Sequence, residues 1–321
     1  MDSMKKKILI GAGGFLLAVI LLTNLLGMSK KGNTPASQAN KVNPKVAAKK
    51  LEDEKKKTEE YRKKFSLKET APKYNDFMIQ AKSGIVVDAE TGEILYEKEV
   101  HQTLSPASIT KILTGAIALE NLDINKKIRV SKHASEMEAF NMSTREGEML
   151  KVDDVMHGLM MISANDAAEI LAEGIDGNRQ TFIDKMSEKT RLLELKETAF
   201  KNPSGLDEPG HTSSAYDIAK MTYYAIKSNP DILKYMGEKK EYSIPKTDEN
   251  DAHYWPGHVS LTMRTYPEML GAKTGFTDEA RNTFIGVAQK NGKKFIFVFM
   301  GSDRGNEDAR TLLTFGLNNT K

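Results

Sequence analysis

Ser108 and Lys111 lie three residues apart in the segment LSPASITK. Pro106 suits the first turn of a helix, and apolar residues follow it at helical spacing, so we expect a helix from about Pro106 to Glu120. A spacing of three places the hydroxyl and the amine on one helix face, one turn apart. In a partly dry pocket this pair is a nucleophile beside a base, because burial and a second cation lower the pKa of a lysine.

The pair alone does not establish catalysis. Ser-x-x-Lys is expected about once or twice by chance in a chain of 321 residues. Two further copies occur, Ser3/Lys6 at the N-terminus and Ser243/Lys246, where Pro245 argues against an intact helix. A surface helix pair therefore remains the alternative until other residues support a cleft.

Two downstream motifs support the presence of a cleft. Ser163 and Asn165 follow an apolar helix expected over residues 152–163, where a turn can lift both side chains into a cleft. Lys273 and Thr274 lie on an expected strand, where a cation and a hydroxyl suit a carboxylate. Each motif alone has a structural explanation, a helix C-cap or an exposed strand charge. All three in this order predict a serine acyl-transfer site.

The elements that must position these residues form a pattern. Further helices are expected over residues 167–174, 181–195, 214–228 and 307–315. Strands are expected over residues 84–88, 94–96, 270–274, 282–288 and 293–300. Strands at both ends with helices between them predict an α/β (α+β) fold, in which one sheet is assembled from N- and C-terminal parts around a helical insertion.

Composition restricts the chemistry further. The 47 basic and 44 acidic residues give a net charge of +3, which provides no argument for nucleic-acid binding. The absence of cysteine excludes disulfides, thiol catalysis and cysteine-ligated metals. The six histidines show no metal-ligand spacing, so no metal and no cofactor are expected.

The N-terminal region predicts a membrane tether. An uncharged run over residues 8–28 follows three lysines and would form a helix of about 31 Å, long enough to cross a bilayer. Small residues do not follow the run closely, so we expect an uncleaved anchor over residues 1–28 with the lysines in the cytoplasm. Residues 29–76 are expected to form a polar linker and a charged helical spacer, and residues 77–321 the catalytic domain.

Five motifs carry a family resemblance, which extends over roughly residues 79–317. They are VDAETG at 87–92, PASITK at 106–111, SAN at 163–165, NPSGLD at 202–207 and KTGFT at 273–277. The chain resembles the low-molecular-mass penicillin-binding proteins, which are serine D-alanyl-D-alanine carboxypeptidases. The resemblance implies the fold shared by penicillin-binding proteins and β-lactamases, an antiparallel sheet flanked by helices with a helical subdomain.

The resemblance also implies roles for the catalytic residues. Ser108 would attack the carbonyl between two D-alanines while Lys111 takes its proton. Ser163 would pass a proton to the leaving amine, and Asn165 would hold the substrate amide. Water would then release the acyl group without a metal.

Substrate binding would fall to the third motif. Lys273 and Thr274 would bind the terminal carboxylate, and Gly275 would let the substrate backbone approach. The backbone N–H of Phe276 would complete an oxyanion hole with that of Ser108. Arg304 matches a carboxylate-binding position only loosely, and an exposed arginine remains the alternative.

The implied partners are peptidoglycan stem peptides ending in D-alanyl-D-alanine, with β-lactams as covalent inhibitors. The implied location is the bacterial cell membrane, with a single span and the catalytic domain on the extracytoplasmic side. A β-lactamase remains an alternative, with Glu208 in a suitable region, although residues 202–206 resemble the carboxypeptidase loop. An endopeptidase, a transpeptidase and a catalytically silent tethered protein are further alternatives.

Overall fold

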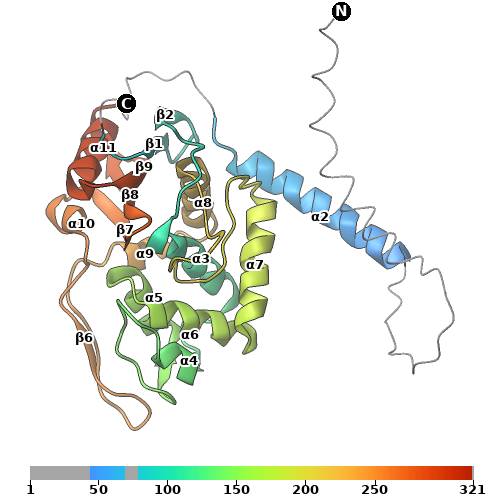
Figure 1. The fold of residues 1–321 in the computed structure, drawn as a ribbon, viewed down its shortest axis with the longest axis vertical. Coiled ribbons are helices and arrows are strands. Elements are labelled where there is room, and N and C mark those ends of the chain that lie inside the picture. Colours follow the sequence, from blue (N-terminus) through green and yellow to red (C-terminus); the bar gives the residue numbers. More distant parts are fainter. Residues whose placement is uncertain (1–43, 69–78, 320–321) are drawn as a thin grey trace, which may run out of the picture. The chain divides into compact units, whose positions relative to one another are not determined.

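The computed structural model describes residues 44–68 and 79–319 (Figure 1). In chain order its helical segments are α2 (Pro44–Phe65), η1 (Ala107–Thr110), α3 (Lys111–Asn121), α4 (Lys132–Ser135), α5 (Val152–Met161), α6 (Asn165–Asp176), α7 (Arg179–Leu192), α8 (Ala215–Ser228), α9 (Ile232–Met236), α10 (Leu261–Thr265) and α11 (Gly305–Asn319). Its strands are β1 (Ser83–Asp88), β2 (Ile94–Lys98), β3 (Lys127–Arg129), β4 (Met149–Lys151), β5 (Tyr242–Ile244), β6 (His253–Trp255), β7 (Met269–Thr277), β8 (Arg281–Lys290) and β9 (Lys293–Ser302).

The central sheet joins the two ends of the catalytic region. Its five strands have the order β2-β1-β9-β8-β7, and every neighbouring pair is antiparallel. Strand β1 pairs with β9 over Ser83–Asp88, so a segment before the helices and a segment near the C-terminus share one sheet. The predicted α+β architecture is therefore confirmed, and β3–β4 and β5–β6 form two small additional ribbons.

The two faces of the sheet carry different side chains because successive residues of a strand point to opposite faces. On β9, Ile296 and Val298 belong to the larger core, which includes residues of α3, α5, α6 and α8. Phe295, Phe297 and Phe299 belong to a second core, packed with α10 and α11. Figure 1 shows α11 beside the C-terminal strands. The helical insertion thus covers the face from which the nucleophile helix α3 approaches.

The helix that carries Ser108 differs from the prediction at its start. Residues Ala107–Thr110 form a 3₁₀ turn, and the α-helix begins only at Lys111. Residues three apart are eclipsed in a 3₁₀ turn, so the Lys111 side chain lies directly above that of Ser108 along the helix axis. The adjoining prediction for residues 152–163 is confirmed with an earlier end, because α5 stops at Met161.

Helix α2 covers the charged segment, and its C-terminal turn packs against other helices. The ring centroid of Phe65 lies 5.0 Å from that of Tyr224 on α8, and Phe65 is buried. Lys57 pairs with Glu188 on α7 at 3.1 Å. Since Leu67 is buried as well, the packed unit includes residues before the predicted domain start at Phe77.

The predicted membrane span over residues 8–28 lies outside the described residues, as does Phe77 itself. Over residues 44–68 and 79–319, no helix has both the length and the apolar character needed to cross a bilayer. The expectation of a tether therefore still rests on the sequence alone.

Candidate active site

The nucleophile turn is held in a strained conformation from both sides. Ala107, directly before Ser108, has a φ of +49°, which L-residues adopt at a cost. A Cβ on Gly205 would lie 2.0 Å from the Ala107 carbonyl oxygen, and one on Gly275 would lie 2.9 Å from the Ser108 nitrogen. Thr283 on β8 donates to the Pro106 carbonyl at 2.9 Å. Two glycines are therefore required where the chain presses against this turn.

Lys111 is fully buried behind Ser108, and three oxygens surround its amine. The Ser108 Oγ lies 2.9 Å from Lys111 Nζ. The amine also donates to Asn165 Oδ1 at 2.7 Å and to the Ser204 carbonyl at 2.6 Å. The Asn165 amide is oriented by its own nitrogen, which donates to the Glu138 carbonyl at 3.1 Å.

This environment suits a neutral amine. Burial, followed by the charge of Lys273, holds the pKa of Lys111 well below its ordinary value. Of the three neighbours, the Ser204 carbonyl and Asn165 Oδ1 can only accept, whereas the Ser108 hydroxyl can donate. A neutral amine has two N–H donors and one lone pair, so it satisfies all three contacts and can receive the Ser108 proton.

Ser163 lies between α5 and α6 and faces the second lysine. Its φ of +62° is left-handed, and its side chain is buried. Lys273 on β7 is fully buried and donates to Ser163 Oγ at 2.7 Å and to the Thr274 carbonyl at 2.7 Å. Burial lowers the pKa of Lys273 to about 7. The turn predicted to lift Ser163 into a cleft therefore places its hydroxyl against Lys273 of the third motif.

A cleft opens in front of these groups. Five predicted residues line a cavity of about 170 Å³, together with Phe140, Ile162, Val259 and Asn282. The five are Ser108, Ser163, Thr274, Gly275 and Phe276. The remaining three predicted residues are Lys111, Asn165 and Lys273, which are buried and bonded to these lining groups or to each other. The three sequence motifs thus meet at one cleft, although 110 residues separate Ser163 from Lys273.

Arg304 lines a larger cavity of about 470 Å³ that shares Thr274, Gly275 and Asn282 with the cleft. Its guanidinium donates to Glu307 at 3.2 Å, and its side chain is 64% exposed. The structure therefore places Arg304 beside the extended cleft but pairs it with its neighbour.

Several groups that residue type and spacing did not predict also contact the catalytic residues or support them. The Ser204 carbonyl contacts Lys111, and the Asn202 Oδ1 accepts from the Gly205 N–H at 2.7 Å. Only the family resemblance points to the segment NPSGLD, since no local pattern indicates that one of its carbonyls faces a lysine. The Nε2 of His211 lies 3.0 Å from Thr110 Oγ1 behind the nucleophile turn.

One group outside the cleft has metal-ligand chemistry. Ligand atoms of His133, Glu169 and Glu173 lie within 4.8 Å of one another. Arg179 Nε donates to Glu169 at 2.9 Å, so this carboxylate already has a cationic partner. The contacts of the group are those of an ion-pair network beside α6.

Comparisons with known sequences agree with this geometry. Residues 67–304 match the family described as D-alanyl-D-alanine carboxypeptidase. The chain is 35% identical over 245 residues to D-alanyl-D-alanine carboxypeptidase DacF of Bacillus subtilis, covering 75% of this chain and 62% of that protein. It is 30% identical over 222 residues to DacB2 of Mycobacterium tuberculosis, covering 68% of this chain and 74% of that protein. The chain spans just under two thirds of DacF and, at 64%, of DacD of Escherichia coli.

Solved structures show the same fold. The crystal structure of the Streptomyces K15 DD-transpeptidase aligns with a TM-score of 0.71 at 25% identity, covering 76% of this chain and all of that one (100%). A D-alanyl-D-alanine carboxypeptidase of Mycobacterium tuberculosis aligns with a TM-score of 0.69 at 26% identity, covering 79% and 96%.

Proposed function

Because the chain belongs to the D-alanyl-D-alanine carboxypeptidase family, we propose that it removes the terminal D-alanine from peptidoglycan stem peptides ending in D-alanyl-D-alanine. The observation that carries this proposal is the buried Lys111 amine, 2.9 Å from Ser108 Oγ, with a second buried lysine opposite.

The chemistry follows from the positions of the protons. Ser108 Oγ attacks the penultimate D-alanine carbonyl, and its proton passes to the lone pair of Lys111. As the C–N bond breaks, Ser163 donates its proton to the departing amine and is reprotonated from Lys273, to which it is hydrogen-bonded. Free D-alanine leaves an ester on Ser108. The proton on Lys111 then replaces the one that Lys273 gave up, so Lys111 is neutral again. Lys111 next deprotonates a water that attacks the ester, and it returns that proton to Ser108 Oγ as the ester breaks.

The developing oxyanion is assigned to the backbone N–H groups of Ser108 and Phe276. Loss of one such donor typically costs about 3–4 kcal/mol in the barrier. The close approach of Gly275 to the Ser108 nitrogen supports this assignment, since a side chain at position 275 would separate the two donors. The terminal carboxylate is assigned to Thr274 and Lys273, and Arg304 lines the adjoining cavity together with Thr274.

The test uses two assays on protein lacking residues 1–28. A fluorescent penicillin is expected to label it covalently, and a peptide ending in D-alanyl-D-alanine is expected to release D-alanine. Ser108→Ala should abolish both, whereas Ser243→Ala, in the second Ser-x-x-Lys copy, should leave both intact. Persistent labelling of the S108A variant would overturn the assignment.

The same assays separate the related activities. Rapid penicillin hydrolysis without D-alanine release would indicate a β-lactamase, and amide formation with an added amine acceptor would indicate a transpeptidase. Cleavage of a crosslinked dimer into two separate peptides without release of D-alanine would indicate an endopeptidase. A silent binding protein would give neither label nor product. The exposed Glu208 is bonded to Asn202 at 3.1 Å, an arrangement that does not favour the β-lactamase alternative.

We also propose, from the sequence alone, that residues 8–28 tether the catalytic domain to the extracytoplasmic face of the bacterial cell membrane. The supporting observations are the length of the uncharged run and the three lysines before it. Full-length protein should sediment with membranes after a high-salt wash, and protein lacking residues 1–28 should not. Release of the full-length protein by salt would contradict the anchor.

A further inference from the structure

Two buried histidines of this protein have the hydrogen-bond pattern of a neutral ring. Nδ1 of His211 accepts from the Lys201 N–H at 3.1 Å, and Nδ1 of His258 accepts from the Ser260 N–H at 3.0 Å. In each ring Nε2 is then free to donate, to Thr110 Oγ1 and to the Ala272 carbonyl respectively. One acceptor and one donor make a complete set for a neutral imidazole. Burial accordingly lowers the pKa of both histidines to about 4.

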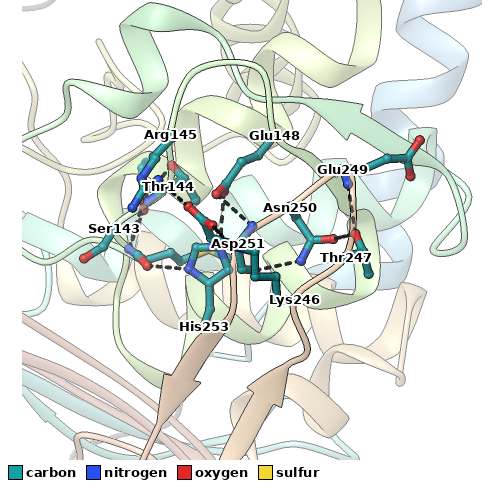
Figure 2. Close-up of polar contacts among 12 residues, drawn as sticks. Ser143, Thr144, Arg145, Glu148, Lys246, Thr247, Glu249, Asn250, Asp251 and His253 are labelled. Carbon is teal, nitrogen blue, oxygen red and sulfur yellow. Dashed lines mark hydrogen bonds and ion pairs between the residues drawn. The ribbon is translucent and has the colours of Figure 1, made fainter.

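His253, on β6, has a different pattern. Its Nδ1 lies 3.1 Å from the Met142 carbonyl oxygen, and its Nε2 lies 3.1 Å from Glu148 Oε2 (Figure 2). A neutral ring has one N–H and can serve only one of these two oxygens. The two contacts together therefore require one additional proton, carried by the imidazole or by the carboxylate.

The pair is shielded from water, and its surroundings hold the carboxylate in place. The side chains of His253 and Glu148 are 4% and 7% exposed. The Asp251 N–H donates to Glu148 Oε1 at 3.1 Å, so both carboxylate oxygens are engaged. The charged groups around the pair belong to ion pairs of their own. They are Arg145 and Lys246, both on Asp251, and Lys127 on Glu249.

The two oxygens that His253 contacts belong to the loop between α4 and β4, residues 136–148, and this loop extends to the active site. Within it, the Met142 N–H donates to the buried Asp166 carboxylate at 2.9 Å. The loop also supplies two carbonyls to Asn165. The Asn165 N–H donates to the Phe140 carbonyl at 2.7 Å, and its side-chain amide donates to the Glu138 carbonyl.

We propose that His253 and Glu148 are positioning residues, and that the proton they share fastens the loop 136–148 to β6 so that Asn165 stays in place on Lys111. The activity measurements that test this proposal rest on the proposed function, whereas the state of the loop can be measured without any substrate. Without the shared proton, one of the two oxygens has no donor, and the loop loses one of its two contacts with His253.

The first test removes both donors and keeps an aromatic ring of similar shape. His253→Phe should speed hydrogen exchange of the Met142 and Asn165 amides at least tenfold. It should also slow acylation by penicillin about tenfold or more, because small displacements of positioning groups reduce rates strongly. Unchanged exchange at both amides would overturn the proposal that the His253–Glu148 pair holds the loop.

The second test asks whether the proton itself matters. In Glu148→Gln the new side-chain amide can donate to Nε2 of a neutral His253, whose Nδ1–H still serves the Met142 carbonyl. This variant should keep the loop as protected as in the wild type and acylation within about threefold of it, because each contact of the pair again has one donor and one acceptor. Exchange as fast in E148Q as in H253F would overturn the role of the shared proton.

A matched control is His157→Phe. His157 is also buried and stacks on Tyr242 of the same ribbon at 4.0 Å, but its Nδ1 is hydrogen-bonded to the Asp153 carbonyl on its own helix rather than to the loop. We expect the control to leave loop exchange unchanged, and loosening of the loop in H157F would count against a specific role for the His253–Glu148 pair. If wild-type protein neither binds penicillin nor releases D-alanine, the proposed function fails. The exchange data still decide whether the His253–Glu148 pair holds the loop.

Discussion

The two sides of the cleft each contribute a fully buried lysine, and their surroundings differ. On the helical side, Lys111 is enclosed by one hydroxyl, one amide oxygen and one backbone carbonyl. On the sheet side, Lys273 contacts the Ser163 hydroxyl and the carbonyl of the next residue. An ammonium group has three donors, so Lys273 retains one for a substrate, whereas the Lys111 contacts are complete for a neutral amine.

The comparison shows that residue type alone does not assign a role. Burial lowers the pKa of both lysines, but Lys111 also experiences the charge of Lys273, which lowers its pKa further. The lysine beside the nucleophile is thereby favoured as a base, and the lysine on β7 as a cation for a carboxylate. Four predictions test this difference between the two lysines.

The largest effect is expected for Lys111→Arg. A guanidinium does not lose its proton in a protein, so it cannot serve as the base. The rate of acylation by penicillin should fall about 10²–10⁴-fold, the usual contribution of general-base catalysis. Stopped-flow measurement of labelling tests this, and a variant within threefold of wild type would show that Lys111 is not the base.

A smaller effect is expected for Lys273→Met. Loss of a charge-assisted carboxylate contact should lower kcat/KM for the D-alanyl-D-alanine peptide about ten- to a hundredfold. Removing this cation also raises the pKa of Lys111, so the acid limb of the acylation profile should move to higher pH. An acid limb that does not move would show that the two lysines are not electrostatically coupled.

The third prediction concerns pH in the wild-type protein. Because the pKa of Lys273 is about 7, its charge is present at lower pH and is lost as the pH rises past that value. KM for the peptide should therefore rise above pH 7, by up to about tenfold per pH unit. A neutral ester substrate without the terminal carboxylate provides the control, and the same rise in its KM would contradict the assignment.

The smallest effect is expected for Thr283→Val on the sheet side. This change removes the hydrogen bond to the Pro106 carbonyl, which should cost about 1–3 kcal/mol of unfolding free energy. Acylation should change less than in the lysine variants, because the Lys111 contacts are unaltered. Urea unfolding and penicillin labelling measure the two quantities, and a larger loss of acylation than of stability would assign Thr283 a direct role.

Much of this arrangement could be predicted from the sequence. The spacing of Ser108 and Lys111, the apolar periodicity of the middle third and the strand-turn-strand pattern around Asn291 are local, and local structure follows from neighbouring residues. The 3₁₀ start at Ala107 was not predicted, because its strained φ is imposed by glycines far along the chain. The burial of Phe65 was also missed, because a helix of mostly charged residues gives no sustained apolar repeat.

Local sequence patterns specify which side chains are available, their order and the elements that carry them. The packing of those elements brings the Ser204 carbonyl to Lys111, Ser163 to Lys273 and His253 to Glu148. These contacts join residues 93, 110 and 105 positions apart. No local propensity specifies such pairs, since they form only when the packed sheet and helices offset the entropy of closing long loops.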